Sequence, residues 1–348
     1  MRIALVSNDY FQSFPCIDAG GVEKIVSDLA YEMRGRGMDF FAVTPKRQKP
    51  LAVGVEVIET PSEPACLESP TNFKNDVVKI LREQEFDIVW SVGPWSSDFS
   101  VLDKPQIISI HCGYSEKPDN YLIDNPNIYY RFVSKYQHDV FVRKDWEKEK
   151  SFWLYNGISD DEFDFTPREA RGDYYLFCAS FLYGIEGKGG YILFDLAQRN
   201  PTRKFKVYGT TDARTNDFLA QVANKTPNLE WCGKLERGEQ HLKAFKEAKA
   251  FLQLSILPES AGTTVKEALS KGTPCIGIPS GATKELISNH IGSWNPVDNL
   301  ENAFYLSYNK EIYQSAYNYS QKFRLLHELN ELIKQSESIL NNGTISRV

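Results

Sequence analysis

Two glutamates, Glu259 and Glu267, are separated by seven residues in the segment 258–286, PESAGTTVKEALSKGTPCIGIPSGATKEL. The pattern predicts that Glu259 lies in the loop after a strand and that Glu267 lies on the first turns of a helix that begins at 262–264. Carboxylates at these places could each bind sugar hydroxyls, and the amides at the helix start could face a phosphate. Acidic residues near a helix start are also common capping choices, so the two glutamates alone favour that ordinary interpretation.

A pair of glycines, Gly20 and Gly21, follows the first predicted strand and opens the first predicted helix, in the segment AGGVEK. Glycines here let the backbone approach a ligand, and a helix start offers its amides to an anion. The segment is not GxGxxG, and no acidic residue ends the next strand as a nicotinamide ribose would require. A structural turn explains the pair equally well.

Lys188 and His111 are further candidates, each with a structural alternative. Lys188 lies in the turn EGKGG before a helix, where its charge opposes the helix dipole, so a bound anion would explain its place better than solvation does. His111 ends an apolar strand, where a histidine is more often a hydrogen-bonded part of the structure. The segment 160–164, DDEFD, resembles a metal-binding cluster, but a solvated acidic turn is the favoured interpretation.

Length and composition limit the class of protein to which this chain can belong. A chain of 348 residues suggests two domains, and 42% hydrophobic with 25% charged residues is the balance of a soluble globular protein. The net charge of −6 gives no general attraction to nucleic acid. The 6 cysteines form no CxxC pair, so neither a zinc site nor a disulfide framework is expected. We find no signal-peptide pattern and no apolar run long enough to span a membrane, and we predict a cytoplasmic protein.

Short apolar strands alternate with amphipathic helices in two series, a pattern typical of parallel sheets covered on both faces. In the first series, the apolar period that starts at Val22 predicts a helix ending at the glycines of RGRG. Strands of this series are predicted at 2–7, 38–45, 86–91, 105–111 and 129–134.

The second series is more regular and indicates a doubly wound domain. Its strands, each followed by a helical stretch, are predicted at 174–180, 204–209, 228–233, 250–255 and 274–278. The polar, turn-rich segment 156–172 between the two series marks the domain junction. The tail from about Tyr305 is helical in pattern, and its last residues, NNGTISRV, are expected to fray.

The segment that begins at Glu259 resembles the signature of the retaining GT-B glycosyltransferases of family four, E-G-F-G-hydrophobic-x-x-x-E-A-x-x-x-G-x-P-V-I. Here it reads E-S-A-G-T-T-V-K-E-A-L-S-K-G-T-P-C-I. Other parts of the family pattern follow in order over 2–290: AGGVEKIVSDLAYEMRGRG, ISIHCG, FVSKYQHDVFV, LYNGISDDEF and EWCGKL. The resemblance implies an α/β fold of the GT-B type, with two facing Rossmann-like, doubly wound parallel-sheet domains and a central cleft.

The resemblance also implies roles for the matching positions. Glu267 would bind the ribose hydroxyls of a nucleotide, and Glu259 would contact the donor sugar. Lys188 would neutralise the diphosphate, and His111 would lie beside the transferred sugar. The remaining positions would contact the donor through their backbone. Gly20 and Gly21 would let a loop close over the diphosphate, and Gly233 and Lys234 would stack against the base. The amides of Gly262, Thr263 and Thr264 would hold the sugar or the diphosphate.

Two departures from the family pattern concern the donor. The usual G-R-L before the K-G is ASF at 179–181 here, so one of two positive partners of the diphosphate is missing or comes from elsewhere, such as Lys271 or Arg237. E-G-F-G has become ESAG at 259–262, which replaces an aromatic residue with a small one. Both departures could mean an unusual donor or weakened catalysis.

The resemblance implies a retaining transfer of a sugar from a UDP- or GDP-sugar to an unidentified acceptor, with neither a metal nor another cofactor. Residues 159–322 would bind this donor and residues 1–158 the acceptor, while the last helix, about 323–348, would pack on the first domain. The acceptor could be a glycan, a lipid-linked molecule or another small molecule, and less readily a nucleic acid. Basic residues such as Arg34 and Arg36 could touch an anionic membrane. The alternatives are a non-catalytic protein that binds sugar nucleotides or glycans, and a nucleotide-sugar epimerase or hydrolase.

Overall fold

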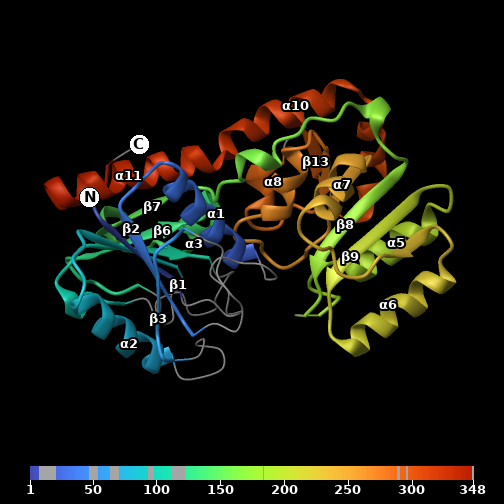
Figure 1. Cartoon of the computed structure of the whole chain (residues 1–348). Coiled ribbons are helices and arrows are strands. Elements are labelled where there is room, and N and C mark those ends of the chain that lie inside the picture. Colours follow the sequence, from blue (N-terminus) through green and yellow to red (C-terminus); the bar gives the residue numbers. More distant parts are fainter. Residues whose placement is uncertain are drawn as a thin grey trace. The chain divides into compact units, whose positions relative to one another are not determined.

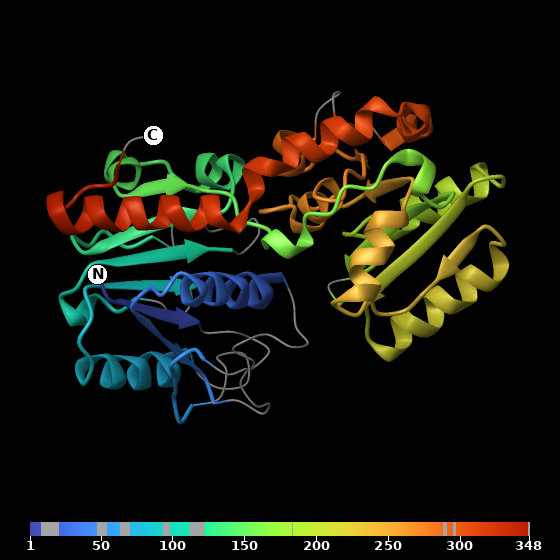
Figure 2. The ribbon, with the colours of Figure 1, turned by 45° about the horizontal axis from the view of Figure 1, so that its top comes forward.

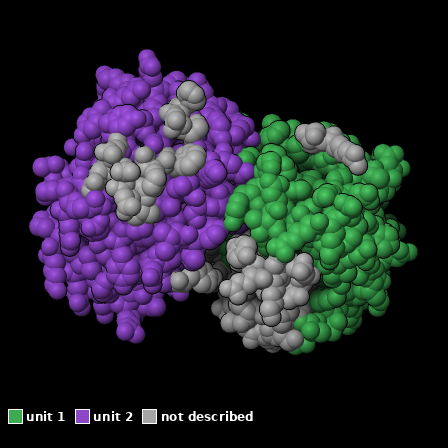
Figure 3. Space-filling model, turned by 180° about the vertical axis from the view of Figure 1, so that it is seen from behind, with its two compact units in different colours: residues 1–159, 324–348 green, residues 160–323 purple. Residues whose placement is uncertain are grey.

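The computed structural model describes residues 1–7, 21–46, 54–62, 70–92, 98–111, 122–182, 184–287, 291–294 and 297–346. The chain divides into two compact units, residues 1–159 with 324–348 (unit 1) and residues 160–323 (unit 2), which are green and purple in Figure 3. Each unit contains one parallel sheet with helices packed on it. The predicted pair of Rossmann-like, doubly wound domains is thereby confirmed.

Unit 1 has a seven-stranded parallel sheet in the order β3-β2-β1-β4-β5-β6-β7 (Figure 1). All residues of β1, β4, β5 and β6 are buried, because helices cover both faces of the central strands. The strands are β1 Ile3–Ser7, β2 Phe40–Thr44, β3 Val57–Glu59, β4 Ile88–Val92, β5 Gln106–Ile110, β6 Ile128–Phe132 and β7 Ser151–Trp153.

The helices of unit 1 form two cores, one on each face of its sheet. Ile3 and Leu5 of β1 pack in a core with apolar residues of α1 and α11, whereas Ala4 and Val6 pack in a core with residues of α2. Since successive side chains of a strand point to opposite faces, one apolar strand serves both cores. The helices are α1 Gly21–Gly35, α2 Pro70–Arg82, α3 Lys135–Phe141, α4 Asp145–Glu149 and α11 Leu325–Asn342.

Helix α11 comes from the end of the chain and lies along the sheet of unit 1 (Figure 2). Leu325, Leu329 and Leu332 are buried in the same core as Ile3. Trp90 of β4 donates a hydrogen bond from Nε1 to Ser336 Oγ at 2.8 Å. The first core of unit 1 is therefore built partly from the last helix of the chain.

A buried ion pair also joins α11 to the sheet. Arg131 Nη2 on β6 lies 2.5 Å from Glu328 Oε1 on α11, and the two side chains are only 2% and 1% exposed. Arg131 Nη2 also donates to Asn156 Oδ1 at 3.0 Å, and the backbone amide of Gly157 donates to Glu328 Oε2. Burial of an uncompensated charge costs several kcal/mol, so each of these charged groups depends on the other.

The end of the chain packs on α11 as far as residue 346, which corrects the expectation that the last residues fray. Gly343 ends α11 in the left-handed conformation, at φ 66°, and its carbonyl accepts a hydrogen bond from Tyr129 Oη at 2.8 Å. Ser346 N donates to Gln335 Oε1 at 2.8 Å, and Gln335 Nε2 donates to Ser346 O at 3.0 Å. The side-chain amide of Gln335 thus forms hydrogen bonds with both the backbone N–H and the backbone carbonyl of Ser346.

Unit 2 has a six-stranded parallel sheet in the order β10-β9-β8-β11-β12-β13. Five of these strands are the predicted ones. The sixth, β13, was not predicted because its residues, Gly-Ser-Trp, form no apolar run. The strands are β8 Tyr174–Ser180, β9 Lys204–Thr210, β10 Leu229–Trp231, β11 Ala250–Gln253, β12 Cys275–Gly277 and β13 Gly292–Trp294.

Helices of unit 2 pack on both faces of its sheet. Tyr175 and Phe177 of β8 are buried in a core with Leu193 of α5 and Leu219 of α6. On the other face, the hydroxyl of Tyr174 donates to a carbonyl of α7 at 2.9 Å. The helices are α5 Gly190–Arg199, α6 Ala213–Lys225, α7 Glu239–Glu247, α8 Thr263–Leu269, α9 Thr283–Leu286 and α10 Glu311–Ser320, with the 3-10 segments η3 Asp160–Glu162 and η5 Val297–Tyr308.

Candidate functional site

The strand order of unit 2 reverses between β8 and β11, because β9 and β10 continue on one side and β12 and β13 on the other. In open parallel sheets, ligands bind at the carboxyl ends of the strands where the order reverses. The segment after β8 carries Lys188, the loop after β11 carries Glu259, and α8 carries Glu267. The topology thus brings three of the predicted residues to the carboxyl edge of one sheet.

Lys188 and Glu259 form an ion pair across this reversal. Lys188 Nζ donates to Glu259 Oε1 at 2.8 Å, and each side chain is 23% exposed. An anion that approaches would compete with the carboxylate for the ammonium group, and a sugar hydroxyl would compete with the ammonium group for the carboxylate. The pair thus presents an ammonium group and a carboxylate, which suit the two parts of a sugar phosphate.

Backbone contacts fix the turn that carries this lysine. The carbonyl of Gly187 accepts hydrogen bonds from the amides of Ile256 and Leu257, at 3.1 and 3.2 Å. Gly189 has a φ of 79°, and a Cβ atom there would lie 2.0 Å from Leu254 O. Only glycine fits so close to the end of β11, so the glycines of EGKGG are required for the approach of the two loops.

Contacts with the segment after β12 fix the Glu259 loop. Glu259 O accepts a hydrogen bond from Ala282 N at 2.8 Å. Gly281 has a φ of 60°, and a Cβ atom there would lie 2.4 Å from Glu259 O. The carboxylate is thus carried by a backbone that two neighbouring loops hold in place.

The predicted helix start at 262–264 is confirmed. Gly262 precedes α8 in the left-handed conformation, at φ 56°, and a Cβ atom there would lie 2.5 Å from Leu286 Cδ1. Thr263 and Thr264 are the first residues of α8, and both are half-buried.

Glu267 is 1% exposed and lies beside two basic side chains of the α7 region. Arg237 Nη1 donates to Glu267 Oε1 at 2.6 Å, and His241 Nε2 lies 3.3 Å from Glu267 Oε2. Burial alone would lower the pKa of Arg237, but the Glu267 carboxylate raises it above its ordinary value. Burial, with the negative charge of Glu267, also raises the pKa of Cys178 on β8 to about 12. Glu267, Arg237 and His241 therefore form one polar network beside β8.

Lys271 and Arg237, the two candidates for the missing positive partner of the diphosphate, lie in different places. Lys271 is fully buried, and its Nζ donates to Glu162 O and, at 3.0 Å, to Ser270 Oγ, so it does not reach the carboxyl edge. Glu162 is itself only 8% exposed, which corrects the expectation that the whole acidic turn at 160–164 is solvated. Arg237 is 35% exposed and lies at the edge, against Glu267.

Gly233 and Lys234 follow β10, two strands away from the reversal. Gly233 has a φ of 76° with open space around its Cα, and its carbonyl accepts a hydrogen bond from Gly209 N at 2.9 Å. Lys234 Nζ is 3.6 Å from Glu236 Oε1. The geometry leaves an accessible backbone surface at Gly233.

In unit 1 the strand order reverses between β1 and β4. Gly21 begins α1, which follows β1, whereas Gly20 lies outside the described residues. His111 directly follows β5, is half-buried, and lines a small cavity with Ser91, Ser109 and Arg131. His111 thus lies at the carboxyl end of a strand of unit 1, and Gly21 lies at the start of the helix that follows β1.

Two family models match the chain, Glycosyltransferase Family 4 over residues 19–161 and Glycosyl transferases group 1 over residues 192–303. The chain belongs to the family-four glycosyltransferases of the GT-B fold. No curated protein shows significant sequence similarity to this glycosyltransferase.

Solved glycosyltransferases resemble this one over nearly its whole length. A glycosyltransferase from Rickettsia africae is 17% identical, with a TM-score of 0.73, over 98% of this chain and 99% of its own. HepE of Anabaena, solved in complex with UDP and glucose, is 17% identical, with a TM-score of 0.69, over 97% and 100%. Sucrose-phosphate synthase from Thermosynechococcus elongatus is 14% identical, with a TM-score of 0.77, over 97% and 98%. These likenesses establish the fold.

The sequence of this glycosyltransferase did not single out His241, and it suggested Arg237 only as a replacement cation. No helical period joins the two residues, because Arg237 lies in the loop before α7 and His241 lies within that helix. Neither their types nor their spacing therefore revealed that both meet a buried glutamate.

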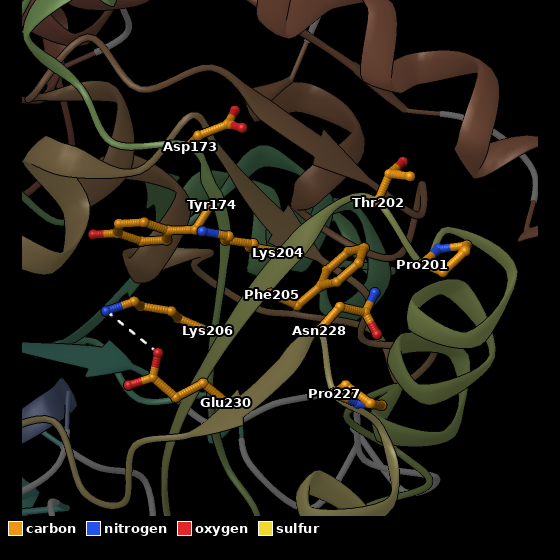
Figure 4. Close-up of a pocket in the computed structure, with 10 residues that line it drawn as sticks. All are labelled: Asp173, Tyr174, Pro201, Thr202, Lys204, Phe205, Lys206, Pro227, Asn228 and Glu230. Atoms are coloured by element: carbon orange, nitrogen blue, oxygen red, sulfur yellow. Dashed lines mark ion pairs between the residues drawn. The ribbon is translucent and has the colours of Figure 1, made fainter.

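A groove of this glycosyltransferase lies at the amino edge of the unit 2 sheet (Figure 4). It has a volume of ≈ 640 Å³ and is lined by the amino ends of β8, β9 and β10, among them Tyr174, Lys206 and Glu230. Lys206 Nζ and Glu230 Oε2 are 3.5 Å apart. We do not place the donor here, because the positions implied by the family lie at the carboxyl edge, as ligand sites of such sheets do.

Within the described part of the chain, no group of three or more His, Cys, Asp and Glu side chains could hold a metal ion. Among the described helices, none has the length and apolar character needed to cross a bilayer.

Proposed function

We propose that this glycosyltransferase moves a sugar from a UDP- or GDP-sugar to an acceptor, with retention of configuration and without a metal or other cofactor. The observation that carries the proposal is the pair of charged contacts at the carboxyl edge of unit 2, Lys188 with Glu259 and Arg237 with Glu267. The solved complex of HepE with UDP-glucose supports a nucleotide-sugar donor.

In this proposal unit 2 binds the donor and unit 1 the acceptor. The base lies on the backbone at Gly233 and Lys234, the ribose on Glu267, and the sugar on Glu259 and the amides of 262–264. Lys188 compensates the charge of the diphosphate as it departs. The family resemblance further assigns Gly20 and Gly21 to the diphosphate and His111 to the transferred sugar.

The bond between the anomeric carbon and the diphosphate oxygen breaks with its electron pair left on the diphosphate, and a bond from that carbon to the acceptor oxygen forms on the same face of the sugar. The proton of the acceptor hydroxyl passes to the leaving diphosphate. Charge that develops on the leaving diphosphate is stabilised by a preorganised ammonium group and helix-start amides. The acceptor is a glycan, a lipid-linked molecule or another small molecule. A cytoplasmic location, with contact to an anionic membrane through basic residues, belongs to the same proposal.

A binding and turnover screen tests the function. Thermal unfolding is measured with UDP, GDP, ADP and their common sugars, since a ligand at about 100 times its dissociation constant adds roughly 2.7 kcal/mol to the stability of the native state. Release of nucleoside diphosphate is then followed with and without glycan and lipid-linked acceptors. Acceptor-dependent release supports transfer. Release without an acceptor would instead indicate a hydrolase or epimerase, binding without release a non-catalytic protein, and no shift would refute the donor site.

Replacement of Lys188 by methionine is expected to lower kcat by about 10²–10³-fold, the usual effect of losing one group that stabilises a developing anion. Binding of the uncharged nucleoside should change little, because Lys188 faces the phosphates in this proposal. Lys243→Met is the matched control. Lys243 is 66% exposed on α7, and its Nζ lies as far as 3.9 Å from Glu247 Oε1, so the loss of its charge should matter little. Equal activity of the two variants would remove Lys188 from the catalytic site.

A further inference from the structure

We propose that Arg237 and His241 are positioning residues for Glu267, and that Arg237 gives up its place on Glu267 Oε1 to the ribose hydroxyls of the nucleotide while His241 keeps Oε2. The inference rests on the proposed function, because it describes how a nucleotide reaches this carboxylate.

The exposure of the three side chains shows which of them can move. Glu267 is 1% exposed, so hydroxyl groups reach it only after a neighbour has moved. Arg237 is 35% exposed and lies in the loop before α7, whereas His241 is 7% exposed and lies within α7. The His241 ring is 4.8 Å from the ring of Phe245, which is fully buried. Arg237 can therefore turn into solvent, and His241 stays beside the carboxylate.

The hydrogen-bonding capacity of His241 fits such an exchange. Its Nε2 lies 3.2 Å from Arg237 Nη1 and 3.3 Å from Glu267 Oε2. A guanidinium group only donates and a carboxylate only accepts, so Nε2 accepts from Arg237 when it lacks a proton and donates to Glu267 when it carries one. Once Arg237 has left, Nε2 can donate to Oε2 while Oε1 accepts from a hydroxyl.

The exchange makes the site selective for a nucleotide that carries both ribose hydroxyls. The hydroxyls must replace a charge-assisted hydrogen bond from Arg237, which is roughly twice as strong as a neutral one. A 2′,3′-dideoxyribose has neither hydroxyl to donate to Glu267 and leaves Arg237 in place. Arg237 thus lowers the affinity for nucleotides that lack the hydroxyls, whereas Glu267 raises the affinity for nucleotides that carry them.

Dissociation constants of two matched nucleotide pairs test the proposal by calorimetry, UDP with 2′,3′-dideoxy-UDP and GDP with 2′,3′-dideoxy-GDP. The readout is the ratio of the dideoxy to the ribo constant. We expect His241→Phe, which keeps the ring packing, to lower the ratio about tenfold through loss of a hydrogen bond to a charged group. His241→Gln should restore most of it. Arg237→Gln should raise the ratio about threefold or more, because a neutral donor is displaced more easily.

Lys206→Gln is the control, because Lys206 belongs to a half-exposed pair at the amino edge of the same sheet. Its ratio should equal that of the unmodified protein. Ratios unchanged in the His241 and Arg237 variants would overturn the proposal, since a purely structural role would move the thermal midpoint and leave the ratio alone. A fall in the ratio with Arg237→Gln would overturn the exchange even if His241→Phe does not fold. If the unmodified protein binds neither ribonucleotide, the proposed function itself fails, whereas binding without these ratio changes refutes only the exchange.

Discussion

Replacement of Glu267 by glutamine is expected to weaken nucleotide binding so far that concentrations which saturate the unmodified protein no longer saturate the variant. A hydrogen bond to a charged group contributes about 1.5–3 kcal/mol, so the loss of the carboxylate should weaken binding roughly 10- to 100-fold. Glutamine also leaves Arg237 without its charged partner. Because the Arg237 side chain is 35% exposed, it can turn to water, and the fold should survive. Thermal shift with UDP and GDP measures the effect.

Glu230→Gln is the matched control for this experiment. Glu230 lies in the same unit but on β10 at the amino edge, where it faces Lys206 and is 62% exposed. The same change of carboxylate to amide should there leave nucleotide binding intact. If both variants bind nucleotide as the unmodified protein does, Glu267 is not the ribose ligand, and the donor site must be sought elsewhere.

Replacement of Glu328 by glutamine should produce the largest loss of stability. The change leaves Arg131 buried beside a neutral group, and breaking a buried pair by removing one charge costs about 3–5 kcal/mol. It also weakens the hydrogen bond to Gly157 N, because a neutral amide oxygen is a poorer acceptor than a carboxylate. Since α11 completes the core of unit 1, we expect that unit to unfold at lower urea concentration. Hydrogen exchange at the amides of α11 reports this transition directly.

Glu32→Gln provides the comparison. Glu32 Oε1 accepts from Arg36 Nε at 2.7 Å, but these two side chains of the α1 region are 28% and 41% exposed. Exposed ion pairs contribute about 0.2–1 kcal/mol, so this variant should hardly change the urea midpoint. Equal effects of the two variants would show that burial of the Arg131–Glu328 pair does not determine the stability of unit 1.

Secondary structure was predictable wherever an apolar period was long enough. The helix from Val22 and the strands of the second series followed from their periods, since each buries a continuous apolar stripe. Helix α2 was missed although its buried residues Phe73, Val77 and Val78 have helical spacing. The edge strands β3 and β7 were also missed, because they are partly exposed and bury no continuous apolar run.

The sequence by itself determined the family, the two doubly wound sheets, and the places of Lys188, Glu259 and Glu267 along the chain. It could do so because glycines and strand ends are local features, and because parallel sheets bring the carboxyl ends of their strands to one edge. The order of strands then decides which loops are neighbours.

Only the tertiary structure decided which side chains meet. It paired Lys188 with Glu259, placed Arg237 and His241 on a buried Glu267, and buried Lys271 away from the site. Residues on different elements have no fixed spacing in the chain, so an apolar period tells which face of an element is buried but does not tell which residue lies opposite it.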